Sequence, residues 1–244
     1  MRFVRSILCA VFFLLFGVGG LLFSFVLLFP LPQAFSRRAL RTSFRFFVWL
    51  GRKTRMFRVE MSPEDRQRLA SLRGAVLVSN HLTLIDAVIL ISLAGDSVCV
   101  TKEAVSRNPF MRAVARNILI VNDSPVDVVR SAGRYLSSGV NVMVFPEGTR
   151  MPADAPEHVF RRGAAHIALQ AGAPVETVSL SCDPPVLGKG QPWWDVGERT
   201  IVYTLRCRGR IGGPEACGGR ESDVSARARA AELTAQMHER IFGA

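Results

Sequence analysis

The sequence predicts an α/β fold, with a mixed, mainly parallel sheet flanked by helices and preceded by an N-terminal membrane-anchoring helical segment. Two observations support this prediction. From about residue 75 onward, short apolar segments typical of buried strands alternate with segments of helical periodicity. Before them stands a long apolar run without charge. The 244 residues are enough for one catalytic domain together with a membrane segment.

The N-terminal run carries no charged side chain over residues 6–36, and residues 7–31 are almost wholly Leu, Phe, Val, Ile and Gly. About 20 apolar residues suffice for a helix that crosses the hydrocarbon layer, whereas the apolar part of a secretory signal peptide is usually about 7 to 15 residues long. A helix buried in a soluble core normally shows a polar stripe, and none is visible here. We therefore assign residues 1–36 to a membrane-inserted helix or, because a glycine cluster interrupts the run, to a re-entrant hairpin.

Residues 37–60 form a strongly basic segment, in which every ionisable side chain up to Arg58 is Arg or Lys. Leu40, Phe44 and Phe47 recur at helical spacing, so we predict a basic amphipathic interfacial helix that fits the anionic surface of a bilayer. Because the heavier positive flank stays cytoplasmic, we expect the domain that follows to lie on the cytoplasmic face of the membrane. Nucleic-acid binding is another use of a chain with net charge +11, but no nucleic-acid motif is present and no such partner is expected.

Residues 61–244 are assigned to the catalytic domain, which begins with a polar linker or short helix over residues 61–73. Apolar segments predict strands at residues 75–79, 97–101, 118–121, 140–145, 175–182 and 201–208. Helical patterns lie at residues 84–93, 109–116, 125–136, 157–170 and 224–241. Strands separated by helices of this length indicate a sheet with helices on its faces. The five cysteines show no metal-binding spacing, so no metal site is predicted.

The first candidate site follows the predicted strand at residues 75–79 and contains Asn80, His81 and Asp86. Reactive groups in open α/β sheets gather at the carboxyl ends of strands. A neutral imidazole there can accept the proton of an attacking hydroxyl, provided that a carboxylate fixes its tautomer. Positions five apart on a straight helix diverge by about 140°, so the pairing requires His81 in the turn and Asp86 in the first helical turn. The structural alternative is a helix cap, in which Asp86 pairs with Thr83 and takes no part in chemistry.

The second candidate site follows the most apolar strand and contains Pro146, Glu147, Gly148, Thr149 and Arg150. Pro146 cannot continue the strand ladder, and Gly148 permits a tight turn. The turn therefore presents Glu147 and Arg150 at the carboxyl end of a strand. An arginine fork held on such a turn suits a phosphate better than a flexible lysine does. The structural alternative is an ordinary ion pair between these two side chains.

Together, and in this order, the two motifs resemble the glycerolipid acyltransferase family, whose type member is 1-acyl-glycerol-3-phosphate acyltransferase. His81 and Asp86 match the histidine and aspartate of the HX4D motif of that family. Residues 145–150 match its Phe-Pro-Glu-Gly-Thr-Arg motif. The resemblance covers roughly residues 75–180 and includes Lys102 and the Phe-Arg-Arg-Gly run at residues 160–163.

The resemblance implies that His81, oriented by Asp86, acts as a general base on an acceptor hydroxyl. This hydroxyl attacks the thioester of acyl-ACP or acyl-CoA, without a covalent acyl-enzyme. The turn of the second motif is expected to bind the acceptor together with Asn80, while Arg150 and Lys102 face its phosphate. The acceptor implied is a lysophosphatidic-acid-like lipid. Family members need no metal or other cofactor, and their active site faces the membrane, so membrane lipids are expected partners.

Two departures from the family bear on the acceptor. Where the family has a phosphate-binding Arg after the strand at residues 118–121, this chain has Asn122 and Asp123, and a carboxylate repels a phosphate. Members of the family often have a second proline in the segment that corresponds to residues 174–177. In this chain the segment contains Glu176. An acyltransferase for a specialised lipid without phosphate, such as a polyene-type product, is therefore an alternative.

Two further alternatives stay open. The first is a hydrolase of acyl esters or thioesters that uses the same pair to activate water, although the nucleophile elbow of serine hydrolases, G-x-S-x-G, is missing from the sequence. The second is a basic membrane-attached adaptor without catalysis.

Overall fold

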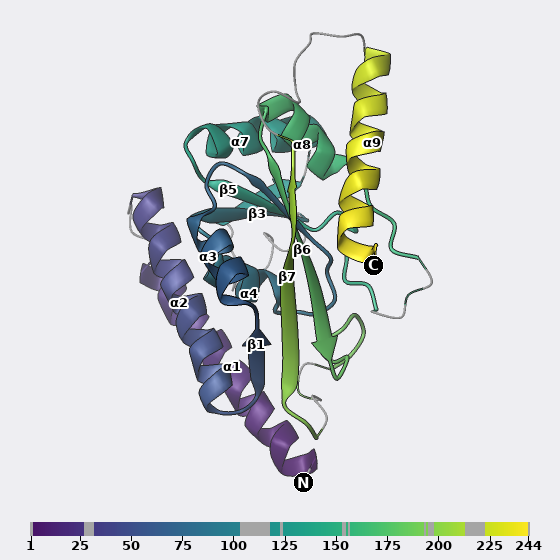
Figure 1. Cartoon of the computed structure of the whole chain (residues 1–244). Helices are drawn as coiled ribbons and strands as arrows, with labels where there is room; N and C mark the ends of the chain where they lie inside the picture. The colour runs from purple at the N-terminus through teal and green to yellow at the C-terminus, as the bar shows by residue number, and fades with distance from the viewer. Residues whose placement is uncertain are drawn as a thin grey trace.

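Seven strands form one sheet at the centre of the protein (Figure 1). The computed structural model describes residues 2–26, 32–102, 118–122, 124–152, 155, 157–192, 194, 198–212 and 223–243, and the strands are counted within these residues. They are β1 (Phe57–Glu60), β2 (Val76–Ser79), β3 (Ser97–Lys102), β4 (Leu119–Asn122), β5 (Asn141–Val144), β6 (Val175–Asp183) and β7 (Ile201–Ile211). Their order is β1-β7-β6-β2-β5-β3-β4, and every pairing is parallel except that of β6 with β7. The predicted mixed, mainly parallel sheet is confirmed.

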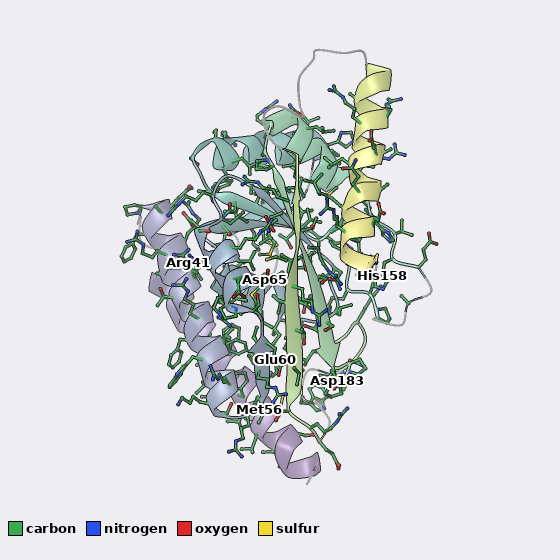
Figure 2. All side chains as sticks on the ribbon, viewed as in Figure 1. Arg41, Met56, Glu60, Asp65, His158 and Asp183 are labelled. Atoms are coloured by element: carbon green, nitrogen blue, oxygen red, sulfur yellow. The ribbon has the colours of Figure 1, made fainter. Side chains whose placement is uncertain are left out.

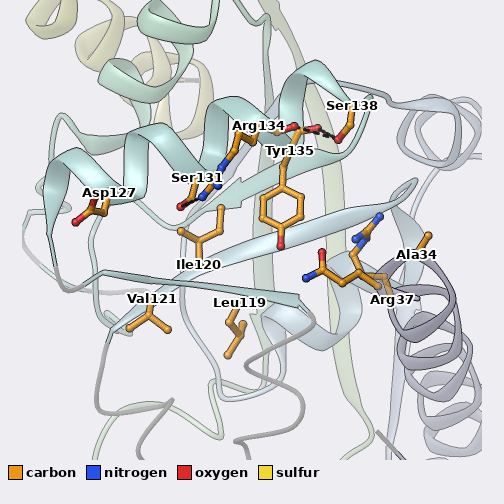
Figure 3. A pocket seen from close by; sticks show the side chains of 11 residues that line it. Ala34, Arg37, Leu119, Ile120, Val121, Asp127, Ser131, Arg134, Tyr135 and Ser138 are labelled. Atoms are coloured by element: carbon orange, nitrogen blue, oxygen red, sulfur yellow. Dashed lines mark hydrogen bonds between the residues drawn. The ribbon is translucent and has the colours of Figure 1, made fainter. Parts of the chain in front are cut away.

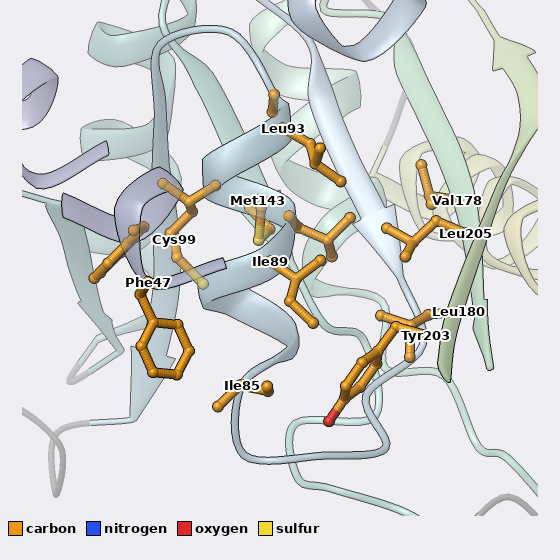
Figure 4. Packing of buried hydrophobic residues seen from close by; sticks show 14 of the residues in the cluster. Phe47, Ile85, Ile89, Leu93, Cys99, Met143, Val178, Leu180, Tyr203 and Leu205 are labelled. Atoms are coloured by element: carbon orange, nitrogen blue, oxygen red, sulfur yellow. The ribbon is translucent and has the colours of Figure 1, made fainter. Parts of the chain in front are cut away.

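Helices cover both faces of this sheet. The described helices are α1 (Arg2–Val26), α2 (Gln33–Lys53), α3 (Pro63–Ser71), α4 (Asp86–Leu93), α7 (Pro125–Ser137), α8 (Gly163–Ala171) and α9 (Asp223–Phe242). On one face, α2 and α4 pack over a cluster that includes Leu77 and Met143, part of which is drawn in Figure 4. On the other face, α7, α8 and α9 cover Val76 and Val78. Successive residues of β2 point to opposite faces, and both faces are apolar because the strand is buried on both sides.

Most of the predicted elements occur close to their predicted positions. The six predicted strands are β2 to β7, and the predicted helices at residues 125–136 and 224–241 are α7 and α9. The polar stretch at residues 61–73 contains the short helix α3. The predicted helix at residues 109–116 lies outside the described residues.

The basic helix differs from its prediction, because α2 begins earlier, at Gln33, and ends at Lys53. Residues 54–60 form a turn and strand β1 instead of continuing the helix. In the turn, the Met56 N–H donates to the Gly51 carbonyl at 2.9 Å. Gly51 fits here because a Cβ at this position would lie 2.3 Å from the ring of Phe57. The helical prediction for residues 54–60 was therefore wrong.

The helix predicted at residues 157–170 is also shorter than expected, because α8 begins only at Gly163. The preceding residues are irregular and pack against the turn of the second motif. The Arg161 N–H donates to the Pro146 carbonyl at 2.9 Å, which holds this segment in place. Helix α4 likewise begins at Asp86, two residues after the predicted start at residue 84.

Helix α1 packs against α2 through aromatic side chains. The ring of Phe47 lies 4.8 Å from that of Phe12 and 4.0 Å from that of Phe16, measured between centroids. Within the residues that the structure describes, no helix is both long enough and apolar enough to cross a membrane. The anchoring role predicted for residues 1–36 is not confirmed.

Helix α2 is held on the domain by some of its arginines. Arg37 forms an ion pair with Asp96 at 3.0 Å, and the Arg45 Nε donates to the Ser92 carbonyl at 2.9 Å. Arg41, labelled on α2 in Figure 2, reaches the carbonyl of Ala94 at 3.4 Å. Part of the positive charge of the predicted interfacial helix is thus used in contacts within the protein.

Candidate active site

The two motifs meet because β2 and β5 are parallel neighbours in the sheet. Their carboxyl ends therefore lie at the same edge, where the chain continues into both motifs. Two hydrogen bonds hold His81 on the second motif and on the residue that follows this motif. The His81 N–H donates to Glu147 Oε2 at 2.7 Å, and the Met151 N–H donates to the His81 carbonyl at 2.8 Å. The backbone of His81 is thus held on both sides.

His81 and Asp86 form a hydrogen-bonded pair, with 2.9 Å between Nδ1 and Asp86 Oδ2. As the spacing requires, His81 lies in the turn and Asp86 is the first residue of α4. The carboxylate also accepts the backbone N–H groups of Leu82 and Thr83, each at 2.7 Å, and the Thr83 hydroxyl. The contact with Thr83 that was considered as a structural alternative therefore exists together with the contact to His81.

The environment of Asp86 fixes the tautomer of His81. The carboxylate is fully buried and accepts three hydrogen bonds from Leu82 and Thr83. An ionised carboxylate can only accept, so the proton of the neutral ring lies on Nδ1 and Nε2 keeps its lone pair. The imidazole stacks on Phe145 with centroids 4.3 Å apart, and its side chain is 21% exposed. The ring is thus fixed in place, while a substrate can still reach it.

Tyr203 on β7 extends this network, and sequence reasoning missed it. Its hydroxyl donates to Thr83 Oγ1 at 3.2 Å, and Thr83 in turn donates to Asp86. Tyr203 is fully buried, and this burial raises the pKa of its phenol well above the ordinary value, so the group stays a donor. A buried aromatic residue in a strand has no local signal for such a role, because its partner lies far away in the sequence.

We expect Tyr203→Phe to lower kcat by about 3- to 10-fold and the free energy of unfolding by about 0.5–1.5 kcal/mol, since one buried hydrogen bond is lost. Steady-state kinetics and urea unfolding measure the two effects. The other tyrosine of the chain is Tyr135, which is half-buried on α7, and Tyr135→Phe provides the matched control. Equal kcat values for the two variants would contradict a role of the phenol in the network.

The turn of the second motif is tight and partly buried. Gly148 has φ +68°, a conformation that side chains disfavour, and its N–H donates to the Phe145 carbonyl at 3.0 Å. Glu147 is buried, and both its oxygens accept hydrogen bonds, Oε2 from His81 and Oε1 from His158 Nδ1 at 2.8 Å. Burial raises the pKa of Glu147, although both histidines oppose this shift. Thr149 is half-buried.

Arg150 connects the turn to the loop after β6. Its Nη1 donates to the carbonyls of Leu187 and Gly188, each at 3.1 Å. The Leu187 carbonyl also accepts the N–H of Leu84 at 3.0 Å, so this loop is held against both motifs. The ion pair between Glu147 and Arg150 that was considered as a structural alternative does not occur among the described contacts, because each side chain has other partners.

For two other predicted binding residues, Asn80 and Lys102, the described contacts include none with the His81 ring. Asn80 is buried and uses both ends of its amide on the backbone of Leu180, with two bonds of 2.8 Å, so it ties the end of β2 to β6. Lys102 is exposed at the carboxyl end of β3, separated from β2 by β5. Asn122 is its register partner on β4, and Asp123 lies outside the described residues.

The second sequence departure, Glu176, lies away from this edge. It sits near the amino end of β6 and pairs with Arg68 of α3 at 2.8 Å, while being almost fully buried. This ion pair explains the acidic residue as part of the packing of α3, and it places no carboxylate beside the candidate site.

A cavity of about 770 Å³ lies against edge strand β4, which β3 separates from β5. Figure 3 shows Tyr135 from α7 and Arg37 from α2 reaching toward it. Its lining includes no residue of either motif. The candidate active site is therefore the paired motifs at the carboxyl edge of β2 and β5.

Two kinds of comparison with known proteins found matches. The family model described as Acyltransferase matches residues 44–181, more than half of the chain, and includes both motifs. The fold is similar to that of PlsC from Thermotoga maritima, a 1-acyl-sn-glycerophosphate (LPA) acyltransferase, with a TM-score of 0.65 and 22% identity over 98% of this chain and 97% of that one. No curated protein sequence matches the chain. The predicted family is confirmed by the family model, and the chain belongs to the acyltransferase family.

Proposed function

We propose that this acyltransferase moves a fatty acyl group from acyl-ACP or acyl-CoA to a hydroxyl of a lipid acceptor, a lysophosphatidic-acid-like lysophospholipid. The observation that carries the proposal is the His81–Asp86 pair at 2.9 Å, held at the carboxyl edge of the sheet in a chain of this family. The acceptor class is supported by the similar fold of an enzyme that acts on 1-acyl-sn-glycerophosphate.

In the proposed reaction, His81 is the general base. Its Nε2 takes the proton of the acceptor hydroxyl while the oxygen attacks the thioester carbonyl, and Asp86 stabilises the imidazolium that forms. The tetrahedral intermediate then collapses, the C–S bond breaks, and the imidazolium gives its proton to the departing sulfur. The products are an ester and a free thiol, and no residue of the protein carries the acyl group.

The turn of residues 147–150 is proposed to bind the acceptor, with Arg150 and Lys102 facing its phosphate. The two carbonyl contacts of Arg150 Nη1 fix the plane of the guanidinium, which favours a two-point contact with an anion. Asn80 is proposed to act indirectly, by fixing the end of β2 from which His81 follows.

Arg150→Lys is expected to raise the KM for a phosphate-bearing acceptor by about 10-fold, because an ammonium cannot reproduce the two-point contact. The KM for the corresponding dephosphorylated acceptor should change by less than about 2-fold, because this acceptor has no phosphate for Arg150 to bind. Measuring both acceptors with one variant controls for any shift of the loop that Arg150 holds. Equal changes in the two KM values would show that Arg150 does not bind the phosphate of the acceptor.

Attachment to the cytoplasmic face of a bacterial inner membrane is also proposed. Helices α1 and α2 expose a set of large apolar side chains, comprising Ile7, Leu8, Val11, Leu14, Leu15, Val18, Phe35, Phe46 and Trp49. Phe46 and Trp49 stack with centroids 5.6 Å apart. Apolar surface beside arginines is typical of segments that lie in the interface of anionic bilayers.

Replacing both Phe46 and Trp49 with serine is expected to lower the fraction of protein bound to anionic vesicles by roughly half or more, because apolar area is lost from the interface. Flotation with vesicles of phosphatidylglycerol and phosphatidylethanolamine measures this fraction. A matched double replacement of Val126 and Val159, which are exposed outside α1 and α2, should leave the fraction unchanged. Equal losses in both variants would contradict attachment through α2.

The proposed activity is tested with purified protein, an acyl thioester and a panel of hydroxyl acceptors. Thiol release and ester formation are measured together, by a thiol reagent and by lipid mass spectrometry. Direct transfer predicts one ester per thiol and negligible thiol release without acceptor. Thiol release that yields free fatty acid instead would identify a hydrolase.

The same panel tests the second candidate, an acyltransferase for a lipid without phosphate. Asn122 and Asp123 favour this candidate, because the family has a phosphate-binding Arg at this point of the sequence. Ester formed only from acceptors without phosphate would select it.

A further inference from the structure

His158 forms a second histidine–carboxylate pair next to the first. Its Nδ1 lies 2.8 Å from Glu147 Oε1, and the two side chains are only 10% and 1% exposed. The other oxygen of Glu147 accepts the backbone N–H of His81 at 2.7 Å. One carboxylate thus joins His158 to the backbone of the proposed general base.

Helix α9 and the irregular segment before α8 hold His158 in this place. Its ring packs on Phe242 in the last turn of α9, with centroids 4.5 Å apart, and Figure 2 shows it beside the C-terminal end of that helix. The ring of Phe242 also packs against that of Phe160, with 5.7 Å between the ring centroids. The Arg161 N–H bonded to Pro146 anchors the same segment on the turn. The imidazole is therefore in a packed position with a defined orientation.

Glu147 depends on donors from outside its own turn. A buried carboxyl group is costly unless its oxygens are hydrogen-bonded, and its two described donors are the His81 N–H and His158. Without His158, Oε1 would keep no described partner, and the carboxyl group would be free to turn away from His81. The orientation of Glu147 is thus set by His158.

We propose that His158 is a positioning residue for acyl transfer: by holding Glu147, it fixes the backbone from which the His81 ring projects. The effect on turnover rests on the proposed function, whereas the effect on the His81 backbone does not. His158 touches neither the His81 ring nor Asp86 in the described contacts, so it acts only through Glu147.

Two replacements separate the hydrogen bond from the packing. His158→Asn keeps a polar group at the place of Nδ1, which can donate or accept, but it loses the ring. His158→Phe keeps a ring against Phe242 but has no polar atom for Glu147. His166→Phe is the matched control, because His166 is exposed on α8.

The first readout is hydrogen exchange of the His81 amide, which needs no activity. If Glu147 turns away, the His81 N–H loses its described acceptor, so exchange should be at least about 10-fold faster in His158→Phe. It should stay near the wild-type rate in His158→Asn and in the His166 control. Unchanged exchange in His158→Phe, or equal acceleration in His158→Asn, would overturn the proposal.

The second readout is kinetic. For His158→Phe we expect kcat to fall by about 10-fold or more, and we expect His158→Asn to restore most of kcat. A role in packing alone predicts the opposite order, since only the phenylalanine keeps the ring. The wild type and all variants could fail to transfer acyl groups while the exchange rates change as expected. In that case the proposed function is wrong, but the positioning of His81 by His158 is supported.

Discussion

Replacing His81 with alanine is expected to lower kcat for acyl transfer by roughly 10²- to 10⁴-fold, the usual contribution of a general base. The ring is the only described side chain that combines a bond to the buried Asp86 with partial exposure at the paired motifs. Its loss removes the proton acceptor but leaves Asp86 with three other donors, so the turn should keep its shape. Steady-state kinetics with a thioester donor measures the effect.

The matched control for this experiment is His166→Ala, because His166 is exposed on α8. Its kcat should stay within about 2-fold of the wild-type value, because His166 takes no part in the proposed general-base catalysis. Circular dichroism and thermal unfolding show whether His81→Ala is folded. A folded His81→Ala protein with kcat within about 3-fold of wild type would exclude His81 as the base and favour another catalytic group.

Asp86→Asn is expected to lower kcat by about 10- to 100-fold, because an amide cannot stabilise the imidazolium as a carboxylate does. It should also destabilise the fold by about 1–3 kcal/mol. The single amide oxygen would have to serve Leu82, Thr83 and His81 together, while the amide N–H₂ would face the Thr83 hydroxyl. Kinetics well below the melting temperature, and urea unfolding, measure the two effects separately.

The matched control is Asp127→Asn, an exposed aspartate in the first turn of α7 that pairs only with exposed Arg130 among the described contacts. This replacement should leave kcat unchanged. It should change the free energy of unfolding by no more than about 0.5 kcal/mol. If Asp86→Asn loses stability but keeps full turnover, Asp86 is a structural residue of the turn, and the proposed pairing has no catalytic role.

The sheet could be predicted from local pattern because most of its strands are short apolar runs buried on both faces. Residues 141–144 and 76–79 show this pattern. Strand β1 could not be predicted in this way. Its sequence, Phe-Arg-Val-Glu, continues the basic composition of the helix before it, and its identity as a strand comes from pairing with β7. Because β7 is so distant in the sequence, this pairing cannot be predicted from the local pattern of β1.

The candidate site shows the same division. His81 and Asp86 could be placed together because the pair spans a single strand-to-helix turn. Tyr203 and His158 could not, because each reaches the site through tertiary contacts, one from β7 and one through packing on α9. The carbonyl partners of Arg150 lie in a loop, whose course the sequence leaves undefined.

We expect the neutral ring of His81 to carry its proton on Nδ1 and to offer Nε2 as the base. ¹⁵N NMR of histidine-labelled protein measures the position of this proton directly. The chain has four histidines, so single replacements assign every ring. The expected spectrum has a protonated Nδ1 and an unprotonated Nε2 for the neutral His81 ring, and Asp86→Asn should shift the Nδ1 signal of His81 more than those of the other rings. A neutral His81 ring with its proton on Nε2, unaffected by Asp86→Asn, would contradict the role of His81 as a base held by Asp86.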